Sequence, residues 1–165
     1  MIFIERITVE NVAVFKEVRL QALQEAPYAF GSTYAREAQF EDAEWVRRAE
    51  KWNGERGIGF IARDEGVACG IAGSFLDAED ASRAQLISMW TAPTHRRKGV
   101  GQMLVESVLG WAKSREARVL QLMVTSHNEG AIRFYERLGF VRTGRVEPYP
   151  NDAAAVEYEM ERAIV

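Results

Sequence analysis

The sequence is poor in cysteine, proline and histidine, and it has no long hydrophobic run. It contains one cysteine, four prolines and two histidines in 165 residues. A single cysteine excludes an internal disulfide, and Cys69 lies in the apolar run "GVACGIAG", where a packed core thiol is expected. A membrane span needs about 20 consecutive apolar residues, and a secretory leader needs a basic start, an apolar core and a cleavage site. Neither pattern is present, so we expect no membrane association and a cytoplasmic location.

The sequence also lacks an excess of basic charge. Lys and Arg total 21 against 24 Asp and Glu, which gives a net charge of -3. This balance disfavours general nucleic-acid binding, which needs a dominant basic face. Hydrophobic residues make up 47% of the chain, enough for a sizeable core, and no repeat or Pro/Ser-rich linker divides it. We therefore expect one domain over residues 1–165.

Hydrophobic periodicity predicts the elements of the first half. Residues 1–8 alternate as a strand does, and residues 11–26 have helical spacing, with Asn11 as a candidate N-cap. A second helix is expected over 40–52. Residues 57–77 read as two strands joined by a tight turn at Asp64-Glu65-Gly66.

The second half alternates between strand and helix. The predicted order is a strand over 83–91, a helix over 99–115, a strand over 118–126, a helix over 127–140, and two final strands around Pro148 and Pro150. Ser126 or Asn128 is expected to cap the last helix, and Gly139 to end it in a left-handed conformation. The strand, helix and strand of residues 83–126 predict a parallel crossover.

The stretch "HRRKGVGQML" (95–104) joins a predicted strand to a predicted helix. Arg96, Arg97 and Lys98 place positive charge where free N–H groups and the helix dipole attract anions, and Gly99 and Gly101 allow close approach. A P-loop would need a lysine after its glycines and then Ser or Thr, and a dinucleotide fingerprint would need G-x-G-x-x-G after the first strand. Neither motif is present, so the stretch fits either another anionic ligand or a solvated basic helix entry whose glycines serve only a tight turn.

Two motifs together identify a resemblance. "RRKGVG" after "LISMWTAP", followed by "LMVTSHNEGAIRFYERLGF" after an intervening helix, resembles the GNAT superfamily of acyl-CoA-dependent N-acetyltransferases over about residues 83–142. The resemblance implies a mixed α/β fold, with a mostly antiparallel sheet of about seven strands, one splayed parallel pair and four flanking helices. It also implies acetyl-CoA as co-substrate and no metal. The implied cofactor-binding residues are Met89, Trp90, Thr91, Arg96, Arg97, Lys98, Gly99, Val100, Gly101, Gln102, Asn128 and Tyr135.

The resemblance also implies roles in acyl transfer. The R-x-x-G-x-G segment would wrap the cofactor pyrophosphate, and a backbone N–H near Trp90 would bind the thioester oxygen. Tyr135 is expected to be the general acid that protonates the departing thiolate. It follows Asn128 by seven residues, so both lie on one face of the predicted helix.

The general base is where the sequence departs from better-known members. By alignment of the motifs, the positions that hold glutamate in those members are Gln85 and Met123, and neither side chain can take a proton. The absence favours an α-amine-like acceptor of lower pKa, which loses its proton more easily than a lysine amine. Ser88, Thr125, His127, or water leading to Glu25 or Glu37 are alternative routes for the proton.

The acceptor site is implied to lie between residues 25–37 and 147–152. Glu25, Tyr28, Phe30 and Tyr149 are the candidate acceptor contacts there. Aromatic and acidic residues suit a cationic or aromatic amine, so a small-molecule amine is the first expectation and a protein or peptide amine the second. A non-catalytic acyl-CoA-binding module is the rival from another class. A homodimer is possible by resemblance.

Overall fold

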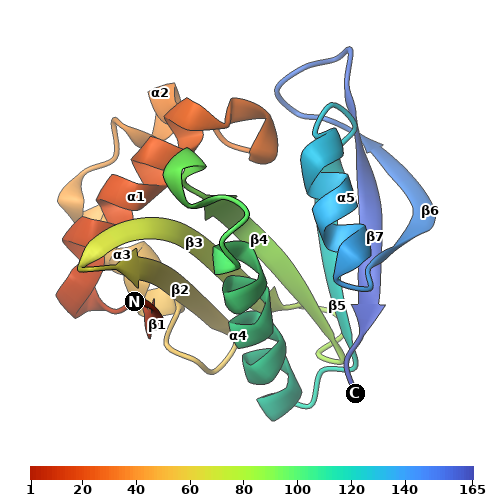
Figure 1. The fold of residues 1–165 in the computed structure, drawn as a ribbon, viewed down its shortest axis with the longest axis horizontal. Helices are drawn as coiled ribbons and strands as arrows, with labels where there is room; N and C mark the ends of the chain where they lie inside the picture. The colour runs from red at the N-terminus through yellow and green to blue at the C-terminus, as the bar shows by residue number, and fades with distance from the viewer.

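The computed structural model describes all residues, 1–165, as one mixed α/β fold around a single sheet (Figure 1). The strands are β1 (Ile2–Arg6), β2 (Gly57–Asp64), β3 (Val67–Leu76), β4 (Arg83–Thr91), β5 (Val119–Thr125), β6 (Val141–Pro148) and β7 (Val156–Ala163). The helices are α1 (Val12–Glu25), α2 (Tyr34–Glu37), α3 (Asp42–Lys51), α4 (Val100–Ser114) and α5 (Glu129–Arg137). Three short 3-10 helices, η1 (Val9–Asn11), η2 (Pro27–Ala29) and η3 (Pro93–His95), complete the order.

The seven strands are ordered β1-β2-β3-β4-β5-β7-β6, and only β4 and β5 run parallel. The sequence therefore predicted the sheet correctly, including its parallel pair. Helix α4 forms the crossover between these two strands, as the strand, helix and strand pattern requires. The turn between β2 and β3 has positive φ at Glu65 and Gly66, which is the conformation of a tight two-residue hairpin.

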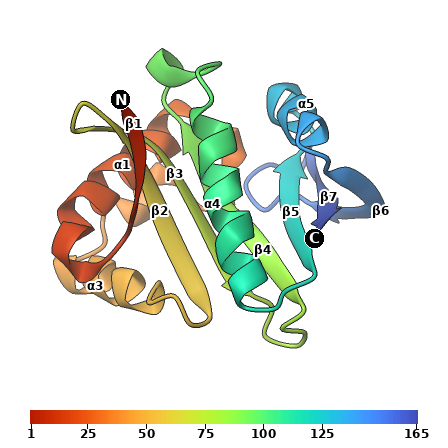
Figure 2. The same cartoon turned by 60° about the horizontal axis from the view of Figure 1, so that its bottom comes forward.

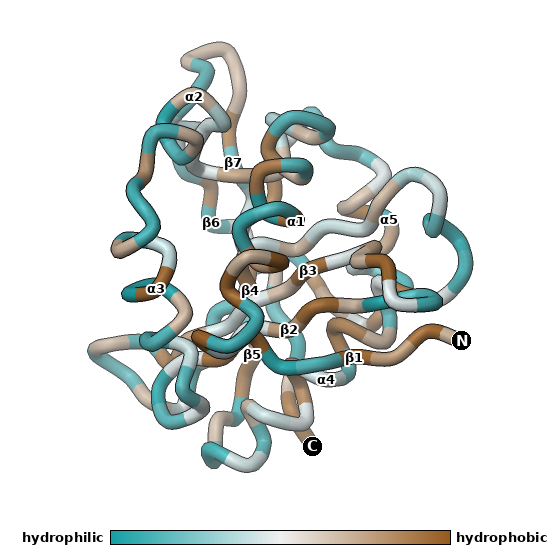
Figure 3. The backbone as a smooth tube through the Cα atoms, turned by 90° about the vertical axis from the view of Figure 1, so that its left-hand side faces the viewer, coloured by the Kyte–Doolittle hydropathy of each residue, from teal (hydrophilic) through white to brown (hydrophobic).

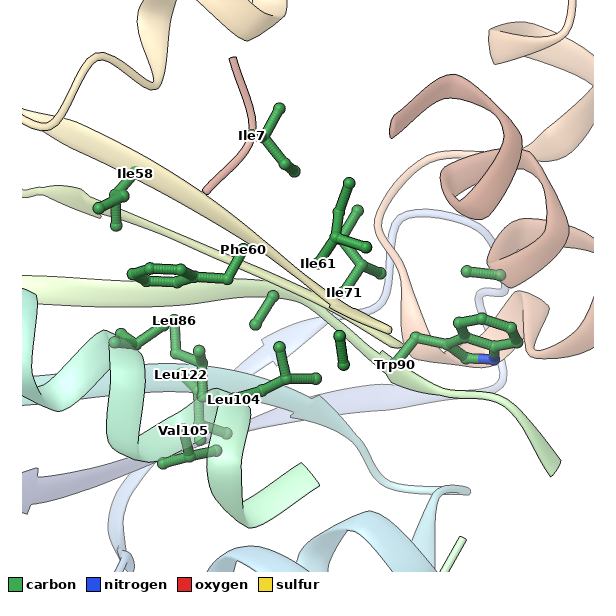
Figure 4. Packing of buried hydrophobic residues seen from close by; sticks show 14 of the residues in the cluster. Ile7, Ile58, Phe60, Ile61, Ile71, Leu86, Trp90, Leu104, Val105 and Leu122 are labelled. Carbon is green, nitrogen blue, oxygen red and sulfur yellow. The ribbon is translucent and has the colours of Figure 1, made fainter. Parts of the chain in front are cut away.

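Two layers of helices cover the sheet. In Figures 1 and 2, α4 and α5 lie on one face, whereas α1 and α3 lie on the other. Figure 3 shows hydrophobic stretches gathered in the central strands and hydrophilic ones in peripheral segments. Figure 4 shows Phe60 and Leu86 directed toward Leu104 and Val105 of α4, while Ile61 lies on the opposite face. One continuous buried cluster thus joins both faces, and Cys69 is part of it, as expected.

The helices differ from the sequence prediction in two places. The structure adds α2, a four-residue helix that was expected to be loop, so five α-helices rather than four flank the sheet. Asn11 occupies the N-cap position of α1, but its side chain makes no capping hydrogen bond to that helix. Its side chain instead accepts a hydrogen bond from the Thr8 backbone N–H, as the closing member of a capping box whose first residue is Thr8.

The last helix follows the prediction closely. Asn128, rather than Ser126, caps α5 by accepting a hydrogen bond from the backbone N–H of Ala131. Gly139 follows the helix end with φ of 89°, the left-handed conformation that a glycine adopts without steric cost.

Gly101 is needed for the contact between α4 and α5. A Cβ atom at this position would lie 2.9 Å from the Phe134 ring and 3.4 Å from the Met89 Cε atom. The missing side chain lets α5 approach α4 where both helices border β4. Gly110, on the same helix, has no atom within 4 Å of the equivalent position.

We expect opposite effects of alanine at these two glycines. Gly101→Ala should lower the free energy of unfolding by about 1–3 kcal/mol because the new methyl group overpacks against an aromatic ring. Gly110→Ala should raise it by about 0.5–1 kcal/mol because alanine favours the helix. Urea unfolding of both variants measures the difference, and equal stabilities would contradict the packing role of Gly101.

Candidate active site

Strands β4 and β5 separate after a short parallel pairing. Their register runs only from Arg83 opposite Val119 to Gln85 opposite Gln121, and both strands continue beyond it. Figures 1 and 2 show them close together at one end and apart at the other. A cavity of about 570 Å³ lies along this divergence, lined by residues of β4, β5, α5 and the segment after α1.

A β-bulge in β4 lies at the start of the open part of the cleft. The register with β3 shifts between Ile71 and Gly73, so Ser88 and Met89 have no regular partner positions. Ser88 has a φ of 56°, which is unfavourable for a residue with a side chain. The Arg19 guanidinium donates a hydrogen bond to the Ser88 Oγ at 3.3 Å, and this contact supports the bulge. The bulge thus falls two residues before Trp90, the residue expected from the sequence to offer its N–H.

The cavity brings together several residues that the sequence singled out. Met89, Asn128, Tyr135, Phe30 and Tyr149 all line it. Asn128 therefore both caps α5 and faces the cavity. Trp90 and Thr91 do not line it, because Trp90 is buried with its indole N–H bonded to Glu25.

Tyr135 has the environment of a proton donor. Its side chain is 7% exposed, its hydroxyl has no hydrogen-bond partner in the protein, and it lines the cavity from α5. Burial raises the pKa of Tyr135 well above the usual tyrosine range, so its hydroxyl keeps its proton at neutral pH. It packs edge-on against Phe134 and Phe140, which fix its orientation.

The segment before α4 has the backbone of an anion-binding loop. Arg97 and Gly99 have φ values of 64° and 86°, and Gly99 precedes a helix that no side chain caps. The first N–H groups of α4 are therefore free of side-chain acceptors and lie at the positive end of the helix dipole. Arg97 and Lys98 are exposed and make no ion pair. These features fit a negatively charged group such as the pyrophosphate of an acyl-CoA.

Three other members of the predicted loop have different surroundings. Arg96 donates to the Thr91 carbonyl oxygen at 3.1 Å and pairs with Glu25, so its guanidinium holds the loop to α1. Val100 is buried, and Gln102 donates to Glu106 along the helix surface. These side chains position the loop, whereas Arg97 and Lys98 remain available to a ligand.

Two of the four candidate acceptor contacts line the cavity, and two do not. Phe30 and Tyr149 line the cavity, and the Tyr149 hydroxyl donates to the Phe30 carbonyl oxygen at 2.7 Å, which joins the two loops. Glu25 does not line the cavity because its carboxylate accepts from Trp90 and Arg96. Tyr28 is 49% exposed and packs outside the cavity against the His127 ring.

The other candidate proton acceptors are engaged in hydrogen bonds or lie outside the cavity. Glu37 is fully buried, and its two oxygens accept from Arg19 at 3.0 and 2.9 Å, with Arg48 at 3.5 Å. Burial alone would raise the pKa of Glu37, but the hydrogen bonds and charge of Arg19 outweigh it and lower that pKa. Glu37 therefore stays ionised as a structural anion. His127 does not line the cavity, and the Thr125 hydroxyl donates to the Tyr28 carbonyl oxygen.

Several cavity residues were not predicted as site residues from the sequence. The cavity is also lined by Arg19 on α1, Phe75 near the end of β3, Asp77 just after β3, and Glu157 on β7. Arg19 looked like one charge on an amphipathic helix, and Glu157 like one of three alternating glutamates in a strand. Only the tertiary arrangement distinguishes them from solvated neighbours.

Comparison with known proteins agrees with this geometry. A family model described as "Acetyltransferase (GNAT) family" matches residues 18–140. The chain belongs to the GNAT acetyltransferase family. It is 34% identical to an uncharacterized N-acetyltransferase of Methanocaldococcus jannaschii over 83 residues, which cover 50% of this chain and 34% of that one. It is 33% identical to streptothricin acetyltransferase of Escherichia coli over 91 residues, 49% of this chain and 51% of the relative. The matches thus span about a third to a half of the relatives' length.

Solved structures share the whole fold. A GNAT-family acetyltransferase of Streptococcus pneumoniae superposes with a TM-score of 0.84 at 20% identity, with all of both chains covered. An acetyltransferase of Salmonella typhimurium, solved with acetyl-CoA, has a TM-score of 0.82 at 17% identity, covering 100% of this chain and 95% of that chain. At these identities the likeness concerns the fold.

No helix of the structure combines the length and apolar character needed to cross a membrane.

We expect the buried Arg19–Glu37–Arg48 cluster to be essential for stability. Glu37→Gln leaves the buried Arg19 guanidinium without its carboxylate, whereas Arg48 keeps Glu44, and the change should cost about 3 kcal/mol of unfolding free energy at pH 7. Because the pKa of Glu37 is lowered in the fold, its contribution is present above the ordinary carboxyl pKa and is lost as pH falls through the folded value. The deficit of the variant should therefore shrink in acid.

Glu44→Gln is the matched control for this prediction. Glu44 pairs with Arg47 and Arg48 on α3 at partly exposed positions, so its loss should cost less than about 1 kcal/mol. Denaturant unfolding between pH 3 and pH 7 measures both variants. Equal losses for Glu37→Gln and Glu44→Gln would contradict the cluster's structural role.

Proposed function

We propose that the protein is an N-acetyltransferase that moves an acetyl group from acetyl-CoA to a primary amine, in a complex that holds both substrates at once. The observation that carries the proposal is the cavity between the splayed strands, which reaches Tyr135 and Asn128 of α5 and the bulge of β4. Family membership supports the donor, because the matched segment includes the anion-binding loop before α4.

The amine attacks the thioester carbonyl, and the departing sulfur needs a proton. Tyr135 is a suitable donor because it lines the cavity and remains protonated. Its high pKa makes full transfer to a thiolate of pKa about 8.5 unfavourable, so the tyrosine is expected to contribute a modest part of the rate. The unpaired positions at Ser88 and Met89 are the candidate backbone donors to the thioester oxygen.

A small molecule is the acceptor that the cavity favours. Its volume of about 570 Å³ lies in the range of small-ligand pockets, and the contact of Tyr149 with the Phe30 carbonyl closes one wall. Streptothricin acetyltransferase, a partial relative, has a small molecule in its name. A protein or peptide amine is the second candidate. The cytoplasmic location and the homodimer stay predictions.

The first test of the proposal is thiol release from acetyl-CoA with a panel of streptothricin, aliphatic primary amines, amino acids and lysine-containing or free-N-terminus peptides. We expect release that depends on one acceptor class. Tyr135→Phe should lower kcat about 10- to 100-fold while the KM for acetyl-CoA changes little, because the hydroxyl acts after binding. Acetyl-CoA binding without turnover of any acceptor would instead support a binding module.

The anion-binding loop gives a second test. Arg97→Ala should weaken acetyl-CoA binding about 10-fold, the loss expected for one charge-assisted contact to phosphate. Arg115→Ala is the control, since Arg115 is exposed at the other end of α4 and makes no ion pair. Calorimetric titration compares the two variants with the wild type. A weaker Arg115→Ala complex would indicate a general charge effect.

A further inference from the structure

The cavity contains few groups that can take a proton. Its ionisable side chains are Arg19, Asp77, Tyr135, Tyr149 and Glu157. Arg19 is bound to Glu37 and Ser88, and Tyr149 donates to the Phe30 carbonyl. Tyr135 holds its proton, so the two carboxylates remain as possible bases.

Asp77 lies at the wrong end of the cleft. Its backbone N–H donates to the Arg83 carbonyl, where β4 is still paired with β5, and its carboxylate accepts from the Glu79 N–H at 2.8 Å. Arg83 is five residues before Ser88, roughly 16 Å along an extended strand. This carboxylate is therefore engaged in a turn, far from the bulge.

Glu157 lies at the open end. It stands opposite Thr125 of β5, and cross-strand partners project from the same face of a sheet. The Thr125 hydroxyl reaches the Tyr28 carbonyl in η2, so this face is the one turned toward the segment that walls the acceptor side. Glu157 thus lines the cavity together with Ser88, Tyr135 and Tyr149.

Among the glutamates of β7, Glu157 alone has no partner. Glu159 accepts from Thr143 and pairs with Arg145, while Glu161 accepts from Gln121 and pairs with Arg83. All three project from one face because side chains alternate along a strand. Partial burial, followed by the nearby Glu147, raises the pKa of Glu157, which moves it toward the range of an effective general base.

We propose that the Glu157 carboxylate is the general base of the reaction, and that the acceptor is a primary amine that enters the cavity as an ammonium ion. The inference rests on the proposed acetyl transfer and supplies the base that Gln85 and Met123 cannot provide. Glu157 binds the ammonium, and the aromatic rings of Phe30 and Tyr149 surround the adjoining apolar part of the acceptor.

The proton balance of the step is complete. The ammonium first gives one proton to Glu157, directly or through water, and Glu157 releases this proton to solvent. The lone pair of the neutral amine then forms a bond to the thioester carbonyl carbon, and the nitrogen becomes more acidic as this bond forms, so the Glu157 carboxylate can accept its second proton. The carbon–sulfur bond breaks, and the sulfur takes a proton from Tyr135. Glu157 passes the second proton to Tyr135 through water, which leaves an N-acetylamine, the CoA thiol and one proton in solvent.

The decisive variant is Glu157→Gln, with Glu159→Gln as the matched control on the same strand and face but outside the cavity. The assay measures kcat/KM from pH 5.5 to 9 with the panel amine of highest activity, streptothricin being tested first. We expect the wild type to lose activity toward acid as Glu157 becomes protonated. Glu157→Gln should lower kcat/KM at least 100-fold at pH 7 and abolish this acidic limb, whereas Glu159→Gln should follow the wild type.

Other titratable groups lie near Glu157, and a control variant tests whether one of them produces the acidic limb. Glu147 faces it from β6, Tyr149 from the following loop, Tyr28 from η2, and Arg19 shares the cavity. His127 packs against Tyr28. His127→Gln should retain the acidic limb if Glu157 produces it.

Measurements of folding and of acetyl-CoA binding distinguish a loss of catalysis in Glu157→Gln from a loss of structure. Because Glu157 has no partner and a raised pKa, its charged form costs stability above the folded pKa, so Glu157→Gln should unfold at the same or a higher temperature. Its Kd for acetyl-CoA should stay within twofold of the wild type. Glu157→Asp, which keeps a carboxylate, should recover part of kcat and the acidic limb.

The outcomes separate the two proposals. If the wild type acetylates an amine, but Glu157→Gln is equally active or keeps the same acidic limb, the role of Glu157 is overturned and the proposed transferase activity stands. A wild type that binds acetyl-CoA but acetylates no amine overturns the proposed function and this inference with it. Preference for neutral aromatic amines over aliphatic ammonium ions overturns the acceptor class.

Discussion

The short parallel pairing of β4 with β5 is the constraint on which the site depends. The two strands share a register of only three residue pairs before they part. A sheet that separates in this way loses ladder hydrogen bonds, and packing on both faces must hold the two halves in place. On one face, α4 and α5 meet through Gly101 and Phe134. On the other, Arg19 connects α1 to the bulge of β4 and to the buried carboxylate of Glu37.

Charge is segregated around this cleft although the whole chain is close to neutral. Arg97, Lys98 and the start of α4 form a positive region, which suits the phosphates of an acyl donor. Glu157 makes the opposite side of the cavity negative, which suits a cationic amine. This distribution fits the proposed transfer from an anionic donor to a cationic amine. The net charge of -3 conceals this arrangement because it sums the two sides.

The sequence predicted those features that depend on local patterns. Periodicity predicted the seven strands and four of the helices. Asn128 caps the start of α5 and Gly139 follows its end, as the chemistry of these residues suggests. The sequence pattern missed α2, because one helical turn leaves no period to detect. It did not show that Glu25 bonds to Trp90 and Arg96 instead of lining the cavity, because the direction of a side chain at a helix end depends on partners distant in sequence.

The same limit explains why Glu157 was not singled out. Alternation in β7 shows that Glu157, Glu159 and Glu161 share a face, and this holds in the structure. Which of them lacks a partner depends on residues of β4, β5 and β6, and these meet β7 only in the folded sheet. A carboxylate that lacks a cationic partner is recognised only when the contacts of its neighbouring carboxylates are known, and a single sequence does not give those contacts.

The surroundings of Tyr135 and Glu157 thus suit these two ionisable groups of the cavity to different roles. Burial without a charge partner raises the pKa of Tyr135, so it holds a proton that a leaving sulfur can receive. Glu157 has a raised pKa as well, but a carboxyl group starts some six units lower than a phenol, at about 4.3 against about 10. In the proposed reaction the tyrosine therefore starts protonated and the glutamate ionised. This division is what an amine that must lose a proton, and a thiolate that must gain one, require of a single cavity.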